Sequence, residues 1–322
     1  MTEFDFIRRY LKQQNDADVV LGIGDDAAIV RPRSGFDLCF SSDMLLKNVH
    51  FFADVSPEDL AWKVLAVNIS DMAAMGAVPR WALLSAGLPE LEADWLQRFC
   101  DSLFALAQRF GVTLIGGDTT RGDLVFNVTI AGELPQGQGL QRHAAQAGDD
   151  IWVSGRIGLA AAALQCRLKK CELPPAVFAV CEQALLRPFP RVALGQAVLP
   201  FARAALDISD GLAQDLGHIL QASGVGATVW LDALPTLPEL KTLLPEAQWQ
   251  ACVLAGGDDY ELVFTAPAEQ RRAILEAAQR SNTPVSRIGI ITETGRLKIT
   301  RSADDDSEIQ LTNTGFDHFD SI

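Results

Sequence analysis

Hydrophobic and polar positions along this chain follow a pattern that predicts short strands separated by amphipathic helices. Apolar runs at 19–23 and 38–41 are each followed by turn residues, as expected of strands. Between 57 and 75 apolar residues recur at helical spacing, with Ser56 as a suitable N-cap and Gly76 as a suitable end. Further helices are predicted at 3–14 and 93–110, and further strands at 113–115 and 124–131.

The second half of the chain repeats this alternation. The Gly-rich, polar stretch 135–148 is the predicted junction between an N-terminal domain, residues 1–140, and a C-terminal domain, residues 149–322. Beyond it the pattern predicts strands at 150–154, 206–208 and 262–265, and helices at about 158–166 and after 211. Strands and helices that alternate in both halves indicate an α/β or α+β fold.

Composition and charge narrow the class of protein. The 322 residues are 48% hydrophobic and 21% charged, which is typical of a globular protein. A net charge of −14 argues against nucleic acid or an anionic membrane as a partner. The sequence has no secretory signal, no membrane-spanning apolar run and no metal-binding spacing among its six cysteines, so a cytoplasmic location is expected.

Acidic residues beside glycines carry the first chemical signal. The segment 22–27 fits the spacing of the dinucleotide fingerprint, but the residues that follow are too strand-like for the helix that this fingerprint requires. Asp25 and Asp26 would also repel a bare pyrophosphate, an objection that a divalent cation removes. Asp26 is therefore a candidate metal ligand, and an ordinary Gly-Asp-Asp turn is the alternative.

Asp71 is a stronger candidate for a metal ligand than the aspartates in turns. It shares a helix face with Val64, Val67 and Met75, so its carboxylate is predicted to point inward. It also lies near the helix C-terminus, where the dipole disfavours negative charge. A carboxylate in this position needs a partner, either a metal ion or a basic side chain.

Four further motifs combine acidic residues with serine, arginine or glycine. They are S-S-D at 41–43 and G-G-D-T-T-R at 116–121, both expected where strands end, D-I-S-D-G at 207–211, and G-G-D-D-Y-E-L at 256–262. Ser209 is the predicted N-cap of the helix that follows it, whose N-terminus suits an anion. Each motif also fits an ordinary turn, but together they predict a metal-dependent phosphate site. The sequence contains no P-loop motif.

Taken in order, these motifs resemble the thiamine-monophosphate kinase family, which shares a superfamily with aminoimidazole ribonucleotide synthetase. The resemblance spans essentially the whole chain and rests on G-I-G-D-D-A at 22–27, V-N-I-S-D-M-A-A-M-G-A at 67–77, G-F-D-H-F at 315–319 and the four motifs above. It implies a two-domain α/β protein that forms a homodimer through a barrel of N-terminal strands. It also implies direct, magnesium-assisted phosphorylation of thiamine monophosphate by ATP, giving thiamine diphosphate.

The resemblance assigns roles to individual residues. It implies several Mg²⁺ ions held by Asp26, Ser41, Ser42, Asp43, Asp71, Asp118, Asp207 and Asp210. It implies ATP contacts from Gly117, Asp118, Arg142 and Ser209, and contacts to thiamine monophosphate from His50, Asp258 and Phe316. No catalytic base is expected, because the acceptor oxygen is already anionic and the transfer depends on alignment and charge neutralisation. This sequence departs from the family at Ser42, Asp258 and Phe316, where Thr, Glu and Trp or Tyr are usual.

Two other functions fit parts of the pattern. A sibling ATP-dependent synthetase of the same superfamily would need a reactive cysteine near the N-terminal glycine loop or at the C-terminus, whereas the first cysteine here is Cys39 and the sequence ends Asp-Ser-Ile. A non-catalytic magnesium-nucleotide sensor would keep the aspartates on the ATP side. It would not need His50, Asp258 and Phe316, and all three positions here hold residues suited to binding thiamine monophosphate.

Overall fold

The computed structural model describes residues 10–11, 17–311 and 313–316. The helix expected at 3–14 falls largely on residues outside this range, as does the end of the 315–319 motif. Two compact units make up the chain, one of Met1–Met72 and Ala77–Gln138, the other of Ala73–Gly76 and Gly139–Ile322. Each unit combines helices with a mixed sheet, as the alternating pattern predicts.

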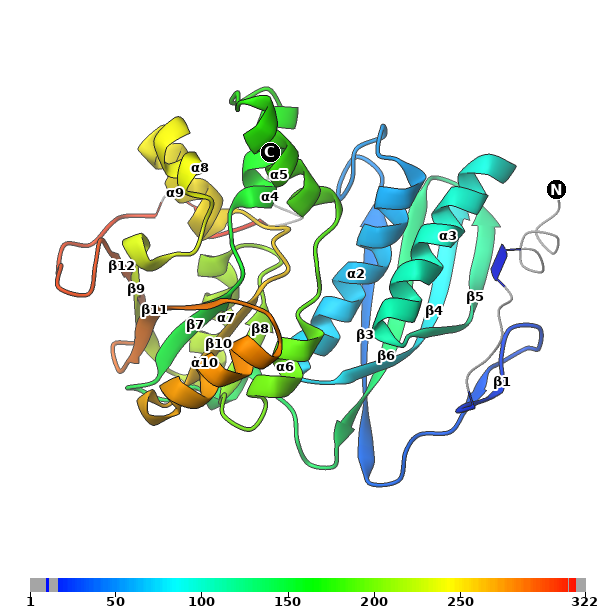
Figure 1. The fold of residues 1–322 in the computed structure, drawn as a ribbon, viewed down its shortest axis with the longest axis horizontal. Coiled ribbons are helices and arrows are strands. Elements are labelled where there is room, and N and C mark those ends of the chain that lie inside the picture. Colours follow the sequence, from blue (N-terminus) through cyan, green and yellow to red (C-terminus); the bar gives the residue numbers. More distant parts are fainter. Residues whose placement is uncertain (1–9, 12–16, 312, 317–322) are drawn as a thin grey trace. The chain divides into compact units, whose positions relative to one another are not determined.

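The first unit is built on a four-stranded sheet (Figure 1). Its spatial order is β3 (Phe36–Leu46), β6 (Val125–Pro135), β4 (Val78–Leu88) and β5 (Thr113–Arg121). The β4–β5 pair is parallel and the other two pairs are antiparallel. A separate two-stranded ribbon joins β1 (Val19–Leu21) to β2 (Ile29–Val30). The described strands of this unit form open sheets, with β3 and β5 as the edges of the larger one.

Two helices, α2 (Pro57–Met75) and α3 (Ala93–Phe110), lie side by side next to this sheet (Figure 1). Val64 and Val67 of α2 are almost completely buried, as its apolar face predicts. Phe99 of α3 stacks on Phe126 of β6 with 4.8 Å between ring centroids. Gly111 ends α3 in the left-handed conformation that the C-terminal turn requires.

Strands β3 and β5 continue beyond their predicted ends. The 41–43 and 116–121 motifs lie within these strands instead of in turns after them, so that part of the prediction was wrong. The reason is that ladder hydrogen bonds involve only the backbone, which pairs Ser42 with Thr129 and Asp118 with Ser85 whatever the side chains are. Polar side chains of these edge strands therefore project from the sheet.

The outward face of β3 is apolar. Alternate residues along the strand are exposed, namely Leu38, Phe40, Met44 and Leu46, and the exposed fraction of Phe40 reaches 67%. Leu83 of the central strand β4 is exposed as well. A cluster of exposed apolar side chains on the edge of a sheet is typical of a surface that another chain covers.

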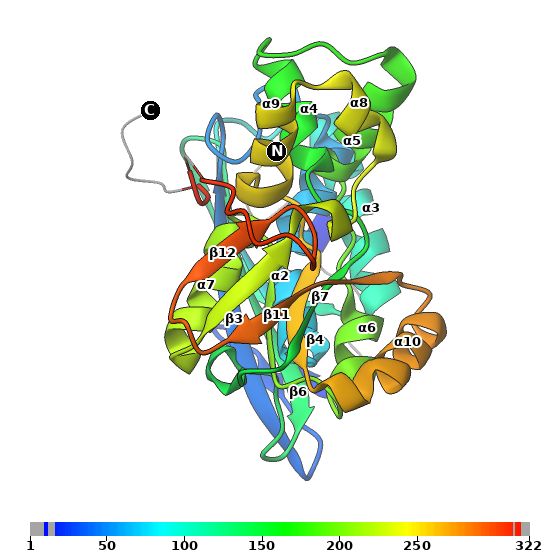
Figure 2. The ribbon, with the colours of Figure 1, turned by 90° about the vertical axis from the view of Figure 1, so that its left-hand side faces the viewer.

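The second unit is built on a six-stranded sheet (Figure 2). Its order is β12 (Leu297–Thr300), β9 (Gly226–Trp230), β11 (Val285–Thr292), β7 (Asp150–Ser154), β10 (Leu262–Ala266) and β8 (Ala204–Asp207). Only the β12–β9 pair is parallel. Every residue of β7 and β10 is buried, so the apolar stretches 151–153 and 262–264 lie in the core of this unit.

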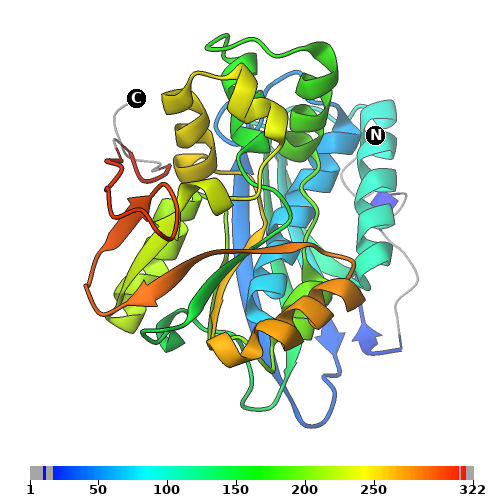
Figure 3. The same ribbon diagram turned by 60° about the vertical axis from the view of Figure 1, so that its left-hand side comes forward.

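Seven α-helices are described in this unit (Figure 3). They are α4 (Leu159–Arg167), α5 (Pro175–Leu186), α6 (Val192–Val198), α7 (Leu212–Ser223), α8 (Pro238–Leu243), α9 (Glu246–Ala255) and α10 (Arg271–Arg280). Helix α7 packs against β8 and β10. Among the residues that the structure describes, no helix is both long enough and apolar enough to cross a membrane.

A buried ion pair joins β7, β10 and the start of α6. Glu261 is 5% exposed and accepts two hydrogen bonds from Arg191, 2.7 Å from Nε and 2.5 Å from Nη2. The Ser154 hydroxyl donates to the same carboxylate at 2.5 Å and accepts the amide hydrogen of Leu262 at 2.8 Å. This group of Arg191, Glu261 and Ser154, which we call the brace, fixes the chain immediately before β10, where the 256–262 motif ends.

Replacing Arg191 with methionine should destabilise the protein by roughly 3 kcal/mol, because the buried Glu261 carboxylate loses its cation. A double variant, Arg191→Met with Glu261→Leu, should recover most of that loss, because apolar partners remove the uncompensated charge. Urea denaturation of the two variants and the parent measures both effects. Equal stabilities of the Arg191→Met variant and the parent would contradict the proposed brace.

Candidate active site

Edge strand β3 and helix α2 bring three of the predicted metal ligands together. The Ser41 hydroxyl donates to Oδ2 of Asp71 at 2.5 Å, so the Asp71 side chain points toward β3. One turn earlier on α2, Oδ1 of the buried Asn68 accepts the amide hydrogen of Asp43 at 3.1 Å. Asn68 is held in turn by the carbonyl of Val64 at 3.0 Å. The helix thus fixes both the backbone and the hydroxyl of the S-S-D motif.

Ser42 projects from the other face of β3. Its hydroxyl lies 3.0 Å from the Thr129 hydroxyl and accepts a hydrogen bond from Asn127 at 3.1 Å. His50 follows the strand, and its Nδ1 accepts the amide hydrogen of Leu46 at 3.0 Å. Asp26 is exposed in the connection between β1 and β2.

Asp118 and Gly117 lie on β5, at the opposite edge of the sheet from Asp43. Three strand spacings separate β3 from β5, which amounts to roughly 14 Å. Within the described residues, no three side chains of His, Cys, Asp and Glu lie close enough to hold a metal ion. Gly117 has a packing role of its own, because a Cβ there would lie 1.8 Å from the Leu84 carbonyl oxygen.

In the C-terminal unit, the D-I-S-D-G motif connects β8 to α7. The prediction that Ser209 caps this helix was wrong: the N-cap is Gly211, with φ at 131°. Asp215, which is 2% exposed, accepts the amide hydrogens of Ser209, Asp210 and Gly211 on its Oδ2 at 3.1, 3.1 and 3.0 Å. The anion-binding position at the start of α7 is therefore filled by the helix's own carboxylate.

The environment of Asp215 opposes its ionisation in part. Burial, and then the neighbouring charge of Asp210, raises the pKa of Asp215 to about 7, while the three amides act in the opposite direction. Asp259 is partly buried and accepts the Gly158 amide hydrogen at 2.8 Å. Its pKa is raised well above the usual value, chiefly by burial.

Three segments far apart in the sequence are joined at this loop. The Asp258 amide donates to the Ser209 carbonyl at 2.8 Å, and the Phe316 amide donates to the Asp210 carbonyl at 3.0 Å. The Gln214 side chain adds two bonds, to the Phe316 carbonyl at 2.9 Å and to Oδ2 of Asp210 at 3.3 Å. The structure thus brings together four of the residues named from the sequence: Ser209, Asp210, Asp258 and Phe316.

The approach of these segments depends on glycine. A Cβ on Gly257 would lie 2.3 Å from the Ser209 carbonyl oxygen. The backbone then turns sharply, because Asp258 and Tyr260 have φ values of 67° and 50°. Residues other than glycine rarely adopt such positive φ values. Such backbone strain is common at functional sites.

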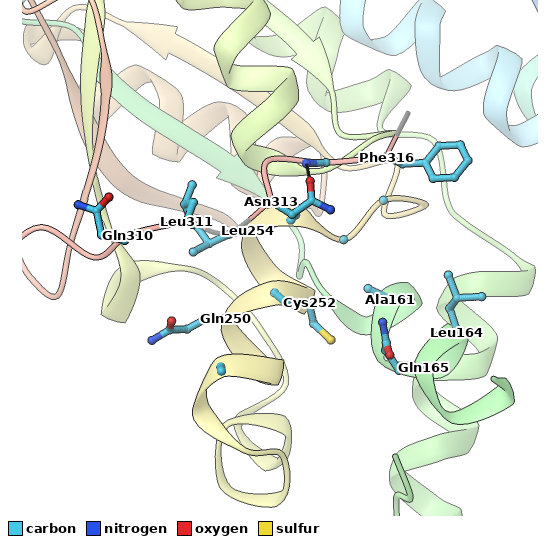
Figure 4. Close-up of a pocket in the computed structure, with 16 residues that line it drawn as sticks. Ala161, Leu164, Gln165, Gln250, Cys252, Leu254, Gln310, Leu311, Asn313 and Phe316 are labelled. Atoms are coloured by element: carbon cyan, nitrogen blue, oxygen red, sulfur yellow. Dashed lines mark hydrogen bonds between the residues drawn. The ribbon is translucent and has the colours of Figure 1, made fainter. Parts of the chain in front are cut away.

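A cavity of about 500 Å³ opens beside this assembly (Figure 4). It is lined by Gly256, Gly257 and Phe316, by apolar residues of α4 and α9, and by the side-chain amides of Gln165, Gln250, Gln310 and Asn313. Its volume and its mixture of apolar walls with a few amides are typical of a pocket for a small organic molecule.

Arg142, named with Ser209 as an ATP contact, lies elsewhere in this unit. Its carbonyl accepts a hydrogen bond from Ser223 at 2.9 Å, at the C-terminal end of α7, whereas Ser209 precedes the N-terminal end. A helix of this length spans about 18 Å. The two backbones are therefore not neighbours.

Comparisons with known proteins agree with this architecture. Residues 24–134 match the family model of the AIR synthase related protein N-terminal domain, and residues 146–302 match that of the C-terminal domain. The thiamine-monophosphate kinase of Haemophilus influenzae is 41% identical over 99% of this chain and 98% of its own length. The chain belongs to the thiamine-monophosphate kinase family.

Solved structures of thiamine-monophosphate kinases share the fold. The crystal structure of the Stenotrophomonas maltophilia kinase has 46% identity and a TM-score of 0.84, covering 89% of this chain and 92% of its own. A structure of AaThiL complexed with AMPPCP and TMP has 30% identity and a TM-score of 0.77, covering 92% of both chains. The hydrogenase maturation protein HypE of E. coli is 20% identical with a TM-score of 0.72, which indicates a common fold only.

Replacing Gly257 with alanine should destabilise the protein by roughly 1–3 kcal/mol, because the new methyl group collides with the Ser209 carbonyl. Gly217→Ala on α7 is the matched control, since nothing lies within 4 Å of its added Cβ. That control should be stabilising by about 0.5–1 kcal/mol, as expected for alanine inside a helix. Denaturation of both variants measures the difference, and a neutral Gly257→Ala would contradict the close approach.

Proposed function

We propose that this chain transfers the γ-phosphoryl group of ATP to thiamine monophosphate, giving thiamine diphosphate and ADP. Membership of the thiamine-monophosphate kinase family over nearly the full length carries the proposal. The joined segments at Ser209, Asp258 and Phe316, beside a cavity of about 500 Å³, support it. An acidic chain of this kind needs cations to accept two polyanionic substrates.

The available donors fit Mg²⁺, which prefers carboxylate and hydroxyl oxygens. We assign the ion sites to Asp26, Ser41, Ser42, Asp43, Asp71 and Asp118 in the N-terminal unit and to Asp207 and Asp210 in the C-terminal unit. The 2.5 Å hydrogen bond between Ser41 and Asp71 supports this assignment, because it brings two of the proposed donors together. Bound Mg²⁺ would supply charge neutralisation for the triphosphate and the acceptor phosphate.

The reaction itself needs no basic side chain. An oxygen of the thiamine monophosphate phosphate forms the new bond to the γ-phosphorus, and the bond from that phosphorus to the bridging oxygen of ADP breaks. We assign Gly117, Asp118, Arg142 and Ser209 to ATP. We assign His50, Asp258 and Phe316 to thiamine monophosphate, with the Phe316 ring stacking on the heterocycle. ATP as co-substrate and six cysteines without disulfide bonds favour the cytoplasm as the site of the reaction.

Purified protein with ATP, Mg²⁺ and thiamine monophosphate should form thiamine diphosphate and ADP in equal amounts, and excess chelator should abolish both. Chromatography of the thiamine phosphates measures the product. Nucleotide binding without product would favour the magnesium-nucleotide sensor. If product forms only with the substrate of another enzyme of the superfamily, the result would favour the sibling synthetase.

The order of strands in the N-terminal unit supports a dimer as the active form. Asp43 and Asp118 lie on opposite edge strands, roughly 14 Å apart, which is too far for one metal ion. Both edges of the sheet are unpaired in the described strands, and the outward face of β3 is apolar. Pairing β3 of one copy with β5 of a second would close a barrel, cover the apolar face and bring Asp43 close to the partner's Asp118.

This arrangement predicts complementation between inactive subunits. Asp43→Asn and Asp118→Asn should each reduce kcat on the order of a hundredfold or more. When the two variants are co-expressed with different tags, half of the dimers are mixed and each mixed dimer has one intact site. The total activity should then recover to about a quarter of that of the parent.

The matched control is co-expression of Asp43→Asn with Asp71→Asn. Ser41, Asp43 and Asp71 belong to one strand–helix cluster of one subunit, so no intact site forms in the mixed dimer. Recovery in this control, or no recovery in the Asp43 and Asp118 pair, would contradict a site shared between subunits.

A further inference from the structure

Three successive peptide groups of the D-I-S-D-G loop share one arrangement. The peptide between Ile208 and Ser209 donates its N–H to Asp215, while its C=O accepts the Tyr260 amide hydrogen at 2.8 Å. The next peptide donates the Asp210 N–H to Asp215 and accepts the Asp258 amide hydrogen on the Ser209 C=O.

The third peptide group continues the pattern. The Gly211 N–H donates to Oδ2 of Asp215 at 3.0 Å, and the C=O of Asp210 accepts the Phe316 amide hydrogen at 3.0 Å. In a trans peptide group the N–H and C=O point in opposite directions and rotate together. A carboxylate that holds the three N–H groups on one side therefore also aims the three C=O groups on the other.

We propose that Asp215 is a positioning residue which, through these three peptide groups, places Asp258 and Phe316 for the substrate and Asp210 for the metal ion. The role assigned to these three residues rests on the proposed function, whereas the coupling of the peptide groups does not. Asp215 touches none of the reacting atoms. Its carboxylate occupies the positive end of α7 and accepts the three amide hydrogens that would otherwise face an anion.

The burial of Asp215 suits this role. A carboxylate that is 2% exposed has little water to compete for its hydrogen bonds, and charge-assisted bonds to amides are stronger than neutral ones. Gln214, the residue before it, holds the Phe316 carbonyl and the Asp210 carboxylate from the solvent side. The first turn of α7 thus contacts the candidate site through two consecutive side chains.

Hydrogen exchange tests the coupling without reference to activity. In Asp215→Ala, the amides of Asp258, Tyr260 and Phe316 should exchange roughly tenfold faster, because the carbonyls that they bond are no longer aimed. Asp215→Asn keeps an oxygen acceptor and should fall between Asp215→Ala and the parent. Strand β10 should exchange as in the parent in both variants.

Asp149→Ala is the matched control. Asp149 is also 2% exposed, and its Oδ2 accepts the Gln146 amide hydrogen at 2.9 Å, but it lies immediately before β7. This control should leave exchange at 258–260 and 316 unchanged. Unchanged exchange at these amides in Asp215→Ala, or an equal increase throughout the C-terminal unit, would overturn the proposal.

Steady-state kinetics tests the consequence for the substrate. Asp215→Ala should raise the KM for thiamine monophosphate at least tenfold, Asp215→Asn should raise it less, and Asp149→Ala should leave it unchanged. Altered exchange with an unchanged KM would overturn the positioning role while leaving the proposed function intact. If the parent forms no thiamine diphosphate at all, the proposed function fails and the exchange result still decides the coupling.

Discussion

The peptide groups between Ile208 and Gly211 hold the C-terminal site together. Their carbonyls accept amides from segments that lie about 50 and 100 residues further along the chain, and their N–H groups are all held by Asp215. Because backbone hydrogen bonds are short and directional, these contacts determine where Asp258 and Phe316 stand. The side chains proposed to contact the substrate thus follow main-chain segments that are bonded to the peptide groups held by Asp215.

In the N-terminal unit, a helix positions the polar side chains of the candidate site. The proposed ligands Ser41, Ser42, Asp43 and Asp118 lie on edge strands, where side chains project from the sheet. Helix α2 contacts those of β3 through Asn68 and Asp71. Burying Asn68 and partly burying Asp71 within an apolar helix is unfavourable unless each finds a partner, and β3 supplies one to both. The same edges that carry the donors are open for pairing, which connects the proposed metal site to the proposed dimer.

Sequence reasoning found the main helices and the two-unit α/β architecture because periodicity and caps are local signals. It ended β3 and β5 too early, since it took the polar residues at 41–43 and 116–121 as strand ends although backbone pairing continues through them.

The sequence also predicted the cap of α7 at Ser209, because serine is a good N-cap. The structure uses Gly211 and fills the amide cluster from Asp215, which in the sequence looks like an ordinary acidic residue of a first turn. Neither the hydrogen bonds that join Asp258 and Phe316 to this loop nor the ion pair of Arg191 with Glu261 has a local signature, so neither could be predicted from the sequence.

The proposed reaction requires that oxygen donors of this chain hold divalent cations against the phosphates of both substrates. Electron paramagnetic resonance of Mn²⁺, bound in place of Mg²⁺ with a non-hydrolysable ATP analogue and thiamine monophosphate, can detect this arrangement. Protein-bound Mn²⁺ should show ³¹P couplings, one of which should be lost when thiamine monophosphate is omitted. A spectrum of Mn²⁺ bound to nucleotide alone, unchanged by the protein or by thiamine monophosphate, would contradict this arrangement.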